Sequence, residues 1–360
     1  MNRLSFEKVF YHLDHLYDYI TQGDCYPVHM TVGLTNRCNH DCIWCYGHDT
    51  ISEHYNDNDF APVNMIVDTI QEAAQVGLQS VTLVGTGEPT LHPKFAEIVR
   101  GIKSTGIDIG LFTNGSLLDE QKIDAIIDTH TFIRLSCSAV DRDEHNRIHH
   151  AGRLGNDFNR IVNNIKSLLL KRAEKPFPTI GVQFLVSHHN WHSLLSACRL
   201  WKDVGVDYFA LKPVYKNPNI PEHEENKVPL KKAVALMKEA RKLEDETFKV
   251  YAKYEQFDRL LNSKDHNRSY DKCHGQAFET FLDPDGKFYI CGNMHGREKF
   301  VIGNAMESGP FKAVWNGQRR KQVLRDLNVN KCPPECRMDP LNRIIEDLIY
   351  PDPEIHPNFL

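Results

Sequence analysis

The chain has 360 residues, 41% hydrophobic and 25% charged, which is enough for one large α/β domain with a small appendage or for two domains. Its formal net charge of −5 argues against a general binder of nucleic acid or anionic membranes, since either would need a basic surface. No run of about 20 apolar residues and no amino-terminal signal peptide are visible, so we expect a cytoplasmic protein without nucleic-acid or membrane partners.

Strand-like and helix-like patterns alternate over the first two-thirds of the chain. β-Branched and aromatic runs predict strands at residues 29–35, 80–85, 108–113, 132–138, 179–186 and 208–214. Amphipathic stretches predict helices at 63–76, 93–104, 119–129, 157–173 and 191–204. The alternation indicates right-handed βαβ units in a parallel sheet. Six units favour an α/β partial barrel, (β/α)6, although their number alone does not separate it from a doubly wound sheet.

The pattern changes after Tyr215. A polar segment with three prolines occupies residues 216–230, and it leads into a predicted helix at 230–243. Short β patterns, turns and four of the ten cysteines follow. We therefore expect a helical extension over residues 1–26, a barrel over 27–250 and a small α+β domain with a C-terminal tail over 251–360.

The first cysteine group follows the first predicted strand. Cys38, Cys42 and Cys45 are spaced CxxxCxxC. Three thiolates leave one iron of a 4Fe–4S cluster open to a small molecule, whereas four would saturate the cluster. A zinc site is the alternative reading, and His40 or His48 would supply its fourth ligand. The spacing alone favours iron–sulfur over zinc.

This motif and three later segments resemble, in the right order, the radical S-adenosylmethionine (SAM) superfamily. Gly87 and Glu88 open a segment similar to the family's GGEP motif, and Asn114 lies in a TNG motif. Ser136 follows Arg134 as in the family's fourth-strand motif. The resemblance covers about residues 27–214 and implies that SAM binds the open iron and is cleaved to a 5′-deoxyadenosyl radical, which removes hydrogen from the substrate. The residues that it implies to contact SAM are Tyr46, Gly87, Glu88, Asn114 and Ser136.

The chain departs from the family pattern at two points. The family's fourth-strand aspartate has no counterpart, since Ser138 follows Cys137 here. The arginine implied to bind the SAM carboxylate is Arg147 or Arg153, and both stay open. Strand alternation places Arg134 and Ser138 on the inner face of the barrel and Cys137 on the outer one.

The second cysteine group lies in the C-terminal third. Cys273 and Cys291 flank a predicted β-hairpin, and Cys332 and Cys336 lie in a later turn. The pattern resembles the twitch or SPASM auxiliary-cluster domain of radical SAM enzymes, which implies a second 4Fe–4S cluster with four thiolate ligands. About three further cysteines would be needed for another auxiliary cluster, so we expect two clusters in all. The alternative is a structural zinc site with four cysteines.

The substrate is less clearly indicated by the sequence. The short stretch before Cys38 has no room for the leader-binding domain of many peptide-modifying relatives, so we expect a small polar, carbohydrate-like substrate. The auxiliary cluster would then accept or return an electron during dehydrogenation or epimerisation, with flavodoxin or ferredoxin as reductant, and Cys25 would matter only to an epimerase. Two alternatives stay open: a peptide-modifying enzyme with a separate leader-binding partner, and a zinc-stabilised binding module. The expected substrate contacts are His149, His150, Gln183, Lys212 and Tyr215.

Overall fold

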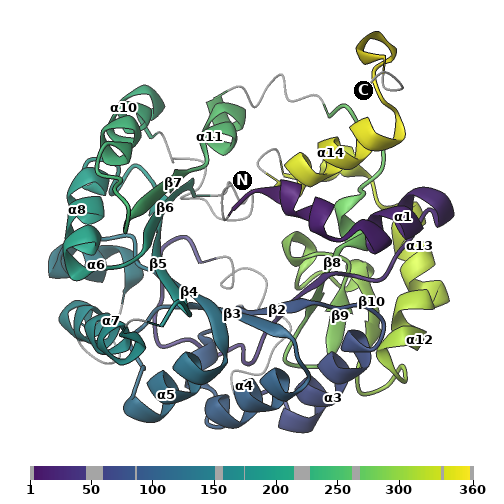
Figure 1. The fold of residues 1–360 in the computed structure, drawn as a ribbon, viewed down its shortest axis with the longest axis horizontal. Coiled ribbons are helices and arrows are strands. Elements are labelled where there is room, and N and C mark those ends of the chain that lie inside the picture. The colour runs from purple at the N-terminus through teal and green to yellow at the C-terminus, as the bar shows by residue number, and fades with distance from the viewer. Residues whose placement is uncertain are drawn as a thin grey trace.

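The computed structural model describes residues 4–45, 60–85, 87–150, 157–173, 175–214, 228–261, 268–333 and 336–356. Its framework is one ten-stranded sheet with the order β10-β9-β8-β1-β2-β3-β4-β5-β6-β7. The sheet curves into an incomplete ring whose outer face is covered by helices (Figure 1). The strands are β1 (His29–Val32), β2 (Ser80–Leu83), β3 (Asp108–Thr113), β4 (His130–Ser136), β5 (Thr179–Val186), β6 (Tyr208–Pro213), β7 (Lys249–Ala252), β8 (Glu279–Leu282), β9 (Lys287–Tyr289) and β10 (Val301–Asn304).

The strand pairing confirms the predicted α/β fold with a parallel partial barrel. Strands β1 to β7 are parallel, each paired with the next along the chain, and β8 joins β1 in parallel on its other side. β8, β9 and β10 form an antiparallel unit at the sheet edge. Strand β7 extends the sheet beyond the six predicted strands, and it includes residue 250, where the sequence suggests a domain boundary.

The outer helices bury one apolar stripe each. In α4, Phe95, Ile98, Val99 and Ile102 recur at helical spacing and are all buried in the main core. Gly205, in the left-handed conformation, ends α8. The helices are η1 (Phe6–Tyr11), α1 (Leu13–Gln22), α3 (Val63–Ala74), η2 (Pro89–Leu91), α4 (Phe95–Ser104), α5 (Glu120–Thr129), α6 (Arg142–His149), α7 (Phe158–Arg172), α8 (Leu194–Val204), α10 (Leu230–Arg241), α11 (Tyr254–Leu261), η4 (Gly275–Ala277), η5 (Gly292–Met294), η6 (Glu298–Phe300), α12 (Phe311–Asn316), α13 (Gln318–Asp326), η7 (Val329–Lys331), α14 (Asp339–Ile349) and η8 (Pro353–Ile355).

Alternation along the strands separates an apolar outer face from a more polar inner face. Phe209 and Leu211 of β6 belong to the core that the helices cover, so Tyr208 and Lys212 lie on the opposite, inner face. Cys137, just after β4, is fully buried in the same outer core, as predicted. The inner face is therefore where the barrel presents polar side chains.

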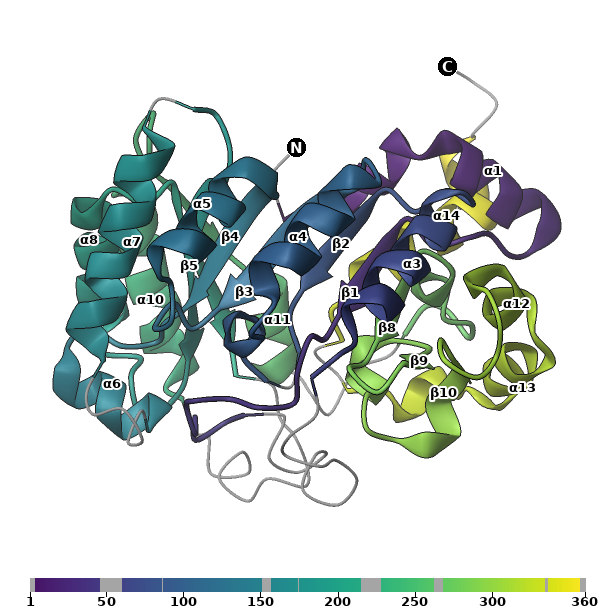
Figure 2. The ribbon, with the colours of Figure 1, turned by 90° about the horizontal axis from the view of Figure 1, so that it is seen from below.

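Helices α1 and α14, which come from the N-terminal and C-terminal parts of the chain, lie side by side (Figures 1 and 2). A second core cluster joins Leu16 and Tyr19 of α1 to Phe278 and to Leu341 and Ile345 of α14. Helix α1, within the helical extension predicted at residues 1–26, thus packs on the C-terminal part of the chain. Among the described residues, no helix is both long enough and apolar enough to cross a bilayer.

Candidate functional site

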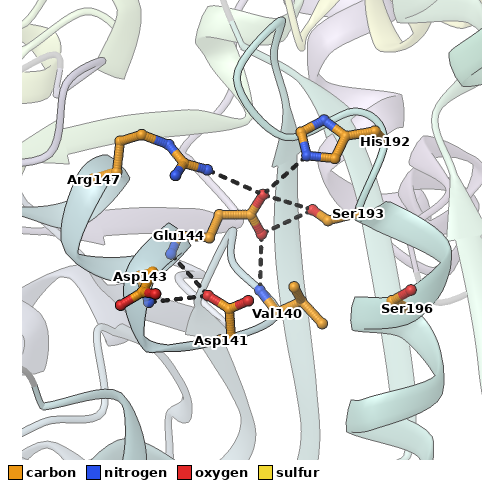
Figure 3. A pocket seen from close by; sticks show the side chains of 8 residues that line it. All are labelled: Val140, Asp141, Asp143, Glu144, Arg147, His192, Ser193 and Ser196. Carbon is orange, nitrogen blue, oxygen red and sulfur yellow. Dashed lines mark hydrogen bonds and ion pairs between the residues drawn. The ribbon is translucent and has the colours of Figure 1, made fainter.

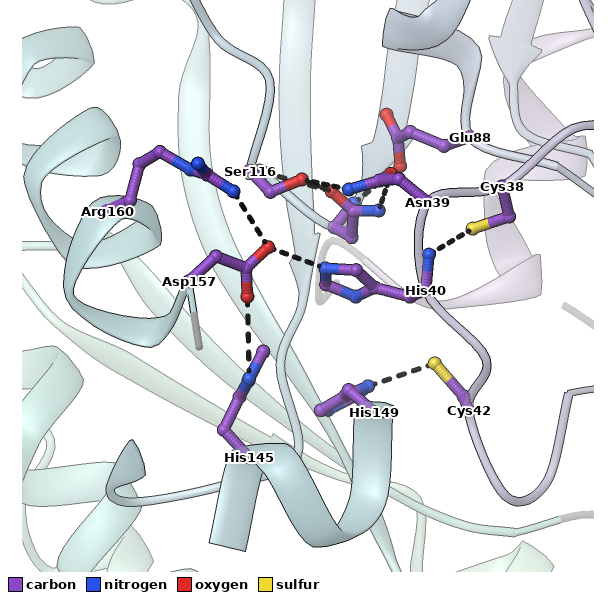
Figure 4. A network of polar contacts seen from close by, with 12 residues as sticks. Cys38, Asn39, His40, Cys42, Glu88, Ser116, His145, His149, Asp157 and Arg160 are labelled. Carbon is purple, nitrogen blue, oxygen red and sulfur yellow. Dashed lines mark hydrogen bonds and ion pairs between the residues drawn. The ribbon is translucent and has the colours of Figure 1, made fainter. Parts of the chain in front are cut away.

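The cysteine loop follows β1 at the carboxyl ends of the parallel strands. The segments after β2, β3 and β4 reach the same edge of the sheet, so motifs far apart in the sequence meet there (Figure 4). The segment that follows β2 packs closely against the cysteine loop at Gly87. A Cβ atom on Gly87 would lie 2.2 Å from the carbonyl oxygen of Arg37 and 2.5 Å from that of Thr35, so only glycine fits. The next amide, that of Glu88, donates to Arg37 O over 2.8 Å.

The Glu88 carboxylate joins the ends of β2 and β3. It is only 3% exposed. Its Oε1 accepts from the Thr90 amide at 3.0 Å, the Thr90 hydroxyl at 2.6 Å and the Thr113 hydroxyl at 2.6 Å. Its Oε2 accepts from the Asn114 amide at 2.7 Å. Four donors satisfy this buried carboxylate, and they make Glu88 an organiser of the backbone around the site.

Asn114 continues the connection from β3 to the cysteine loop. Its Nδ2 donates to Asn39 Oδ1 over 2.9 Å, and its Oδ1 accepts from the amide and hydroxyl of Ser116. Asn39 in turn donates to the Ser116 hydroxyl at 2.7 Å. Since Asn39 lies between Cys38 and Cys42, this closed network holds the cysteine loop against the end of β3 (Figure 4).

The C-terminal end of α6 holds the other side of the loop. The amide of Asp41 donates to His149 O over 3.1 Å, and that of Ile43 donates to Ile148 O over 3.0 Å. These carbonyls have no partner inside the helix because they belong to its last turn. The cysteine loop therefore caps α6, and α6 fixes the loop in return.

His149 also contacts a candidate cluster ligand directly. The Ser138 amide donates to His149 Nε2 over 3.0 Å, so the ring proton must be on Nδ1. Nδ1 lies 3.1 Å from Cys42 Sγ and is the donor of that contact (Figure 4). Burial, and then the neighbouring histidines, lower the His149 pKa well below its usual value, so the ring is neutral. Both ring nitrogens are engaged within the protein, which differs from the expected contact with substrate.

A buried carboxylate holds the middle of the loop. Asp157 Oδ2 accepts from His40 Nε2 at 2.9 Å and lies 3.3 Å from an Arg160 nitrogen. His145 Nδ1 lies 3.6 Å from Asp157 Oδ1. Burial would raise the Asp157 pKa, but the hydrogen bond from His40 and the nearby positive charges lower it below the usual value. His40, considered above as a zinc ligand, thus has a carboxylate partner.

The spacing of the sulfur atoms argues against a zinc site made of cysteines alone. A tetrahedral zinc ion with sulfur ligands at 2.3 Å would draw those sulfurs to about 3.8 Å from one another. No three sulfurs of either cysteine group, all of whose members are described, lie within 4.8 Å of one another, whereas ligand atoms of His40, Cys42 and His149 do. A 4Fe–4S cluster spaces its thiolates more widely and fits this arrangement.

In the first group Cys38 is exposed and Cys42 and Cys45 are half-buried, and the three thiols are close enough to repel as thiolates. Desolvation by the surrounding chain, followed by the charge of Glu88, raises the Cys38 pKa above its usual value. Burial and then Cys45 and Cys38 raise that of Cys42 well above its usual value. Positive iron would relieve this cost, so three thiols without a fourth fit an open cluster.

The second group converges from three segments of the C-terminal part. Cys291 follows the predicted hairpin, which is the β8–β9 pair, and burial followed by Cys273 and Cys336 raises its pKa well above the usual value. Cys332 also contributes to that rise. Asn293 Nδ2 lies 3.6 Å from Cys336 Sγ. Four thiols that approach one another in this way fit a fully ligated cluster.

Other predicted residues fall into separate places. Arg147 is on the opposite side of α6 from His149 and lies 3.7 Å from Glu144 Oε1 in a pocket between α6 and α8 (Figure 3). His150 is exposed and ends α6 in the left-handed conformation. Cys25 is buried before β1, at the opposite end of that strand from the cysteine loop, with its Sγ 3.5 Å from Ala277 O. The predicted contacts Tyr46, Arg153 and Tyr215, together with His48, lie outside the described residues.

Ser136, Gln183 and Lys212 lie on the inner face. Ser136 of β4 is level with Gln183 of β5, and Lys212 of β6 is level with Leu185 of β5. The sequence did not identify the contacts of His40, Asp157 and His149, because their partners are 107 to 117 residues apart along the chain.

Comparison with known proteins agrees with this geometry. Residues 32–211 match the model of the radical SAM superfamily, and residues 273–338 match that of an iron–sulfur cluster-binding domain, SPASM. A probable GTP 3′,8-cyclase of Saccharolobus solfataricus is 29% identical over 49% of this chain and 54% of its own length. A tungsten-containing aldehyde ferredoxin oxidoreductase cofactor-modifying protein of Pyrococcus furiosus is 28% identical over 50% of this chain and 49% of its own. The chain thus spans about half the length of these curated relatives.

Solved structures share the fold at low identity. Streptococcus suis SuiB bound to precursor peptide SuiA superposes with a TM-score of 0.66 at 12% identity, over 88% of this chain and 71% of that one. Native anSMEcpe with bound AdoMet gives 0.61 at 16% identity, over 83% of both chains. The family match covers half of the chain, and the cofactors of the two matched domains are SAM and 4Fe–4S clusters. This chain belongs to the radical SAM superfamily and carries a C-terminal SPASM domain.

Proposed function

We propose that Cys38, Cys42 and Cys45 hold the SAM-binding cluster, and that the four later cysteines hold one auxiliary cluster. When bound, the first cluster supplies the electron that cleaves SAM, and the resulting 5′-deoxyadenosyl radical removes hydrogen from the substrate. The observation that carries this assignment is the convergence of the Gly87, Glu88 and Asn114 segments on the cysteine loop.

The residues around the first group position the ligands. Gly87 leaves the backbone close enough for the loop to rest on it, while Glu88 and Asn114 lock that backbone to the loop. His149 donates a hydrogen bond toward the sulfur of Cys42 and stays neutral. These residues would hold the cluster rigidly, and three cysteine ligands would leave SAM to supply the rest.

We further propose an oxidative outcome on a small polar, carbohydrate-like substrate, with flavodoxin or ferredoxin as the reductant. A fully ligated auxiliary cluster has no site for substrate, which suits it to accept an electron. Epimerisation would need a hydrogen donor beside the radical, and Cys25 is buried at the far end of β1. That position favours dehydrogenation over an epimerase that uses Cys25.

A peptide-modifying activity is the second candidate. The fold is similar to that of SuiB, whose structure was solved with its precursor peptide, over 88% of this chain. At 12% identity that similarity concerns the fold, so the peptide substrate is a proposal only.

The test is 5′-deoxyadenosine formation by anaerobically reconstituted, reduced protein with SAM. Panels of sugars, sugar acids, nucleotide sugars and short peptides are compared, and stimulation by one class identifies the substrate family. Replacing Cys38, Cys42 and Cys45 by alanine should abolish SAM cleavage and reduce bound iron from about eight atoms to about four. Protein that holds zinc and no iron would overturn the proposal.

A further inference from the structure

The inner face of the barrel carries a buried cation without an anionic partner. Arg134 of β4 is 7% exposed, and its guanidinium lies 4.5 Å from the ring centroid of Phe112. Its Nε donates to the Tyr208 hydroxyl over 3.3 Å. Within the part of the chain that the structure describes, no carboxylate pairs with Arg134.

Half-buried Lys212, on β6 and separated from β4 by β5, is a second basic group without an anionic partner. It lies on the inner face and makes no hydrogen bond or ion pair among the described residues. Burial lowers the Lys212 pKa well below its usual value, and the positive charges of Arg134 and Arg337 lower it further. These like charges disfavour the protonated amine of Lys212, and an anionic ligand beside it would favour that form.

Among the described residues, four other buried or half-buried arginines pair with carboxylates, whereas half-buried Arg268 donates to the carbonyls of Cys332 and Pro333. Arg172 pairs with Asp207, Arg259 with Asp339, Arg320 with Asp24 and Arg337 with Glu279. Burying an unpaired charge is strongly unfavourable, because the water that is lost is not replaced by a counter-charge. Arg134 and Lys212 therefore leave the inner face short of negative charge.

An acceptor without a donor lies beside these cations. Gln183 of β5 has a buried Oε1 that makes no hydrogen bond. Gln183 is two residues before Leu185, the residue level with Lys212, on the same face of β5. A ligand with an anionic group and a hydroxyl or amine donor would neutralise the basic side chains and donate a hydrogen bond to Gln183 Oε1.

We propose that the substrate carries a carboxylate or phosphate, which Lys212 contacts on the inner face while Arg134 adds a second positive charge, and that a donor on the substrate contacts Gln183. This inference rests on the proposed function and specifies the substrate class: a hydroxylated anion in place of a neutral sugar. Arg134 is covered by aromatic rings, so Lys212 is the group that reaches the ligand directly.

Binding is tested without turnover by amine acylation of the anaerobic holoenzyme with SAM, followed by mass spectrometry. We expect millimolar inorganic phosphate or malonate to slow acylation of Lys212 by at least about tenfold. Glycerol should not protect it, and exposed Lys231 should react equally in all samples. Stronger protection by phosphate identifies a phosphate ligand, and stronger protection by malonate a carboxylate. Equal reactivity of Lys212 with and without both anions overturns the proposal.

Variants test the role of the charge with substrate present. Sugar phosphates and sugar acids should stimulate 5′-deoxyadenosine formation more than the parent sugars. Lys212→Met should raise the half-saturating concentration at least about tenfold, whereas Lys212→Arg should keep it close to the original value. Lys231→Met is the matched control. A Lys212→Arg variant that behaves like Lys212→Met contradicts the proposal.

The two proposals fail in different ways. SAM cleavage by iron-loaded protein, without protection of Lys212 by any anion, overturns the anionic substrate alone. Protection of Lys212 in a protein that never cleaves SAM overturns the proposed function and leaves an anion site.

Discussion

At the scale of single residues, the hydrogen bonds of His149 suggest how the protein adjusts the proposed SAM-binding cluster. The Ser138 amide fixes the tautomer of His149, and Nδ1–H then faces Cys42 Sγ at 3.1 Å. A hydrogen bond to a cluster ligand stabilises the reduced, more negative state and raises the reduction potential. We therefore predict that His149→Phe lowers the midpoint potential by on the order of 50 mV, since one such bond contributes about 1 kcal/mol. The midpoint potential is measured by a redox titration in which electron paramagnetic resonance monitors the reduced cluster.

The matched control for this substitution is His145→Phe. His145 lies one turn earlier on the same side of α6 and faces Asp157. The His145→Phe substitution also replaces an imidazole by a phenyl ring, but it removes no hydrogen bond to a cysteine sulfur. Equal potentials in the two variants would contradict a tuning role for His149, and loss of iron from both would identify the histidines as supports of the loop only.

At the scale of elements, the Glu88 carboxylate is the connection between β2 and β3. Glu88→Gln replaces one acceptor oxygen by an NH2 group that faces donors from Thr90, Thr113 and Asn114. We predict a loss of about 2 kcal/mol in stability, because buried donors are left unsatisfied. Thr113→Val should cost less, since Glu88 keeps three donors. Anaerobic thermal unfolding measures both, with exposed Glu246→Gln as the control; a Glu88→Gln variant as stable as Glu246→Gln would refute the connection.

The sequence predicted the elements better than their contacts. Strands β3 and β5 have the predicted bounds, whereas β1 ends at Val32 and not at residue 35. Strand β7 has only four residues, with Lys249 and Tyr251 among them, and so gave no clear apolar pattern. Local motifs indicated Gly87 and Asn114 through resemblance alone. Their physical roles depend on Arg37 O and Asn39, which only the folded chain brings near.

At the scale of the whole molecule, an ion pair between a buried arginine and a partly exposed aspartate joins the N-terminal segment to the C-terminal part. Arg320 of α13 is 1% exposed, and its Nη2 donates to Asp24 Oδ1 at 2.8 Å and to Gln276 Oε1 at 3.0 Å. Its guanidinium lies 3.8 Å from the ring centroid of Trp315. Trp315 Nε1 in turn donates to Cys25 O over 2.8 Å. These contacts fix the segment that precedes β1 relative to the part of the chain that carries the second cysteine group.

The two partners of this pair differ in exposure, which makes their substitutions unequal. Asp24 is 43% exposed, so Arg320→Met leaves a carboxylate that water can solvate and a side chain that still packs on Trp315. Asp24→Asn leaves a buried guanidinium without its counter-charge. We predict a loss of about 3 kcal/mol for Asp24→Asn and about 1 kcal/mol for Arg320→Met, measured by anaerobic unfolding with exposed Asp68→Asn as the control. Equal losses, or a larger one for Arg320→Met, would mean that packing on Trp315 and not charge neutralisation holds the two ends of the chain together.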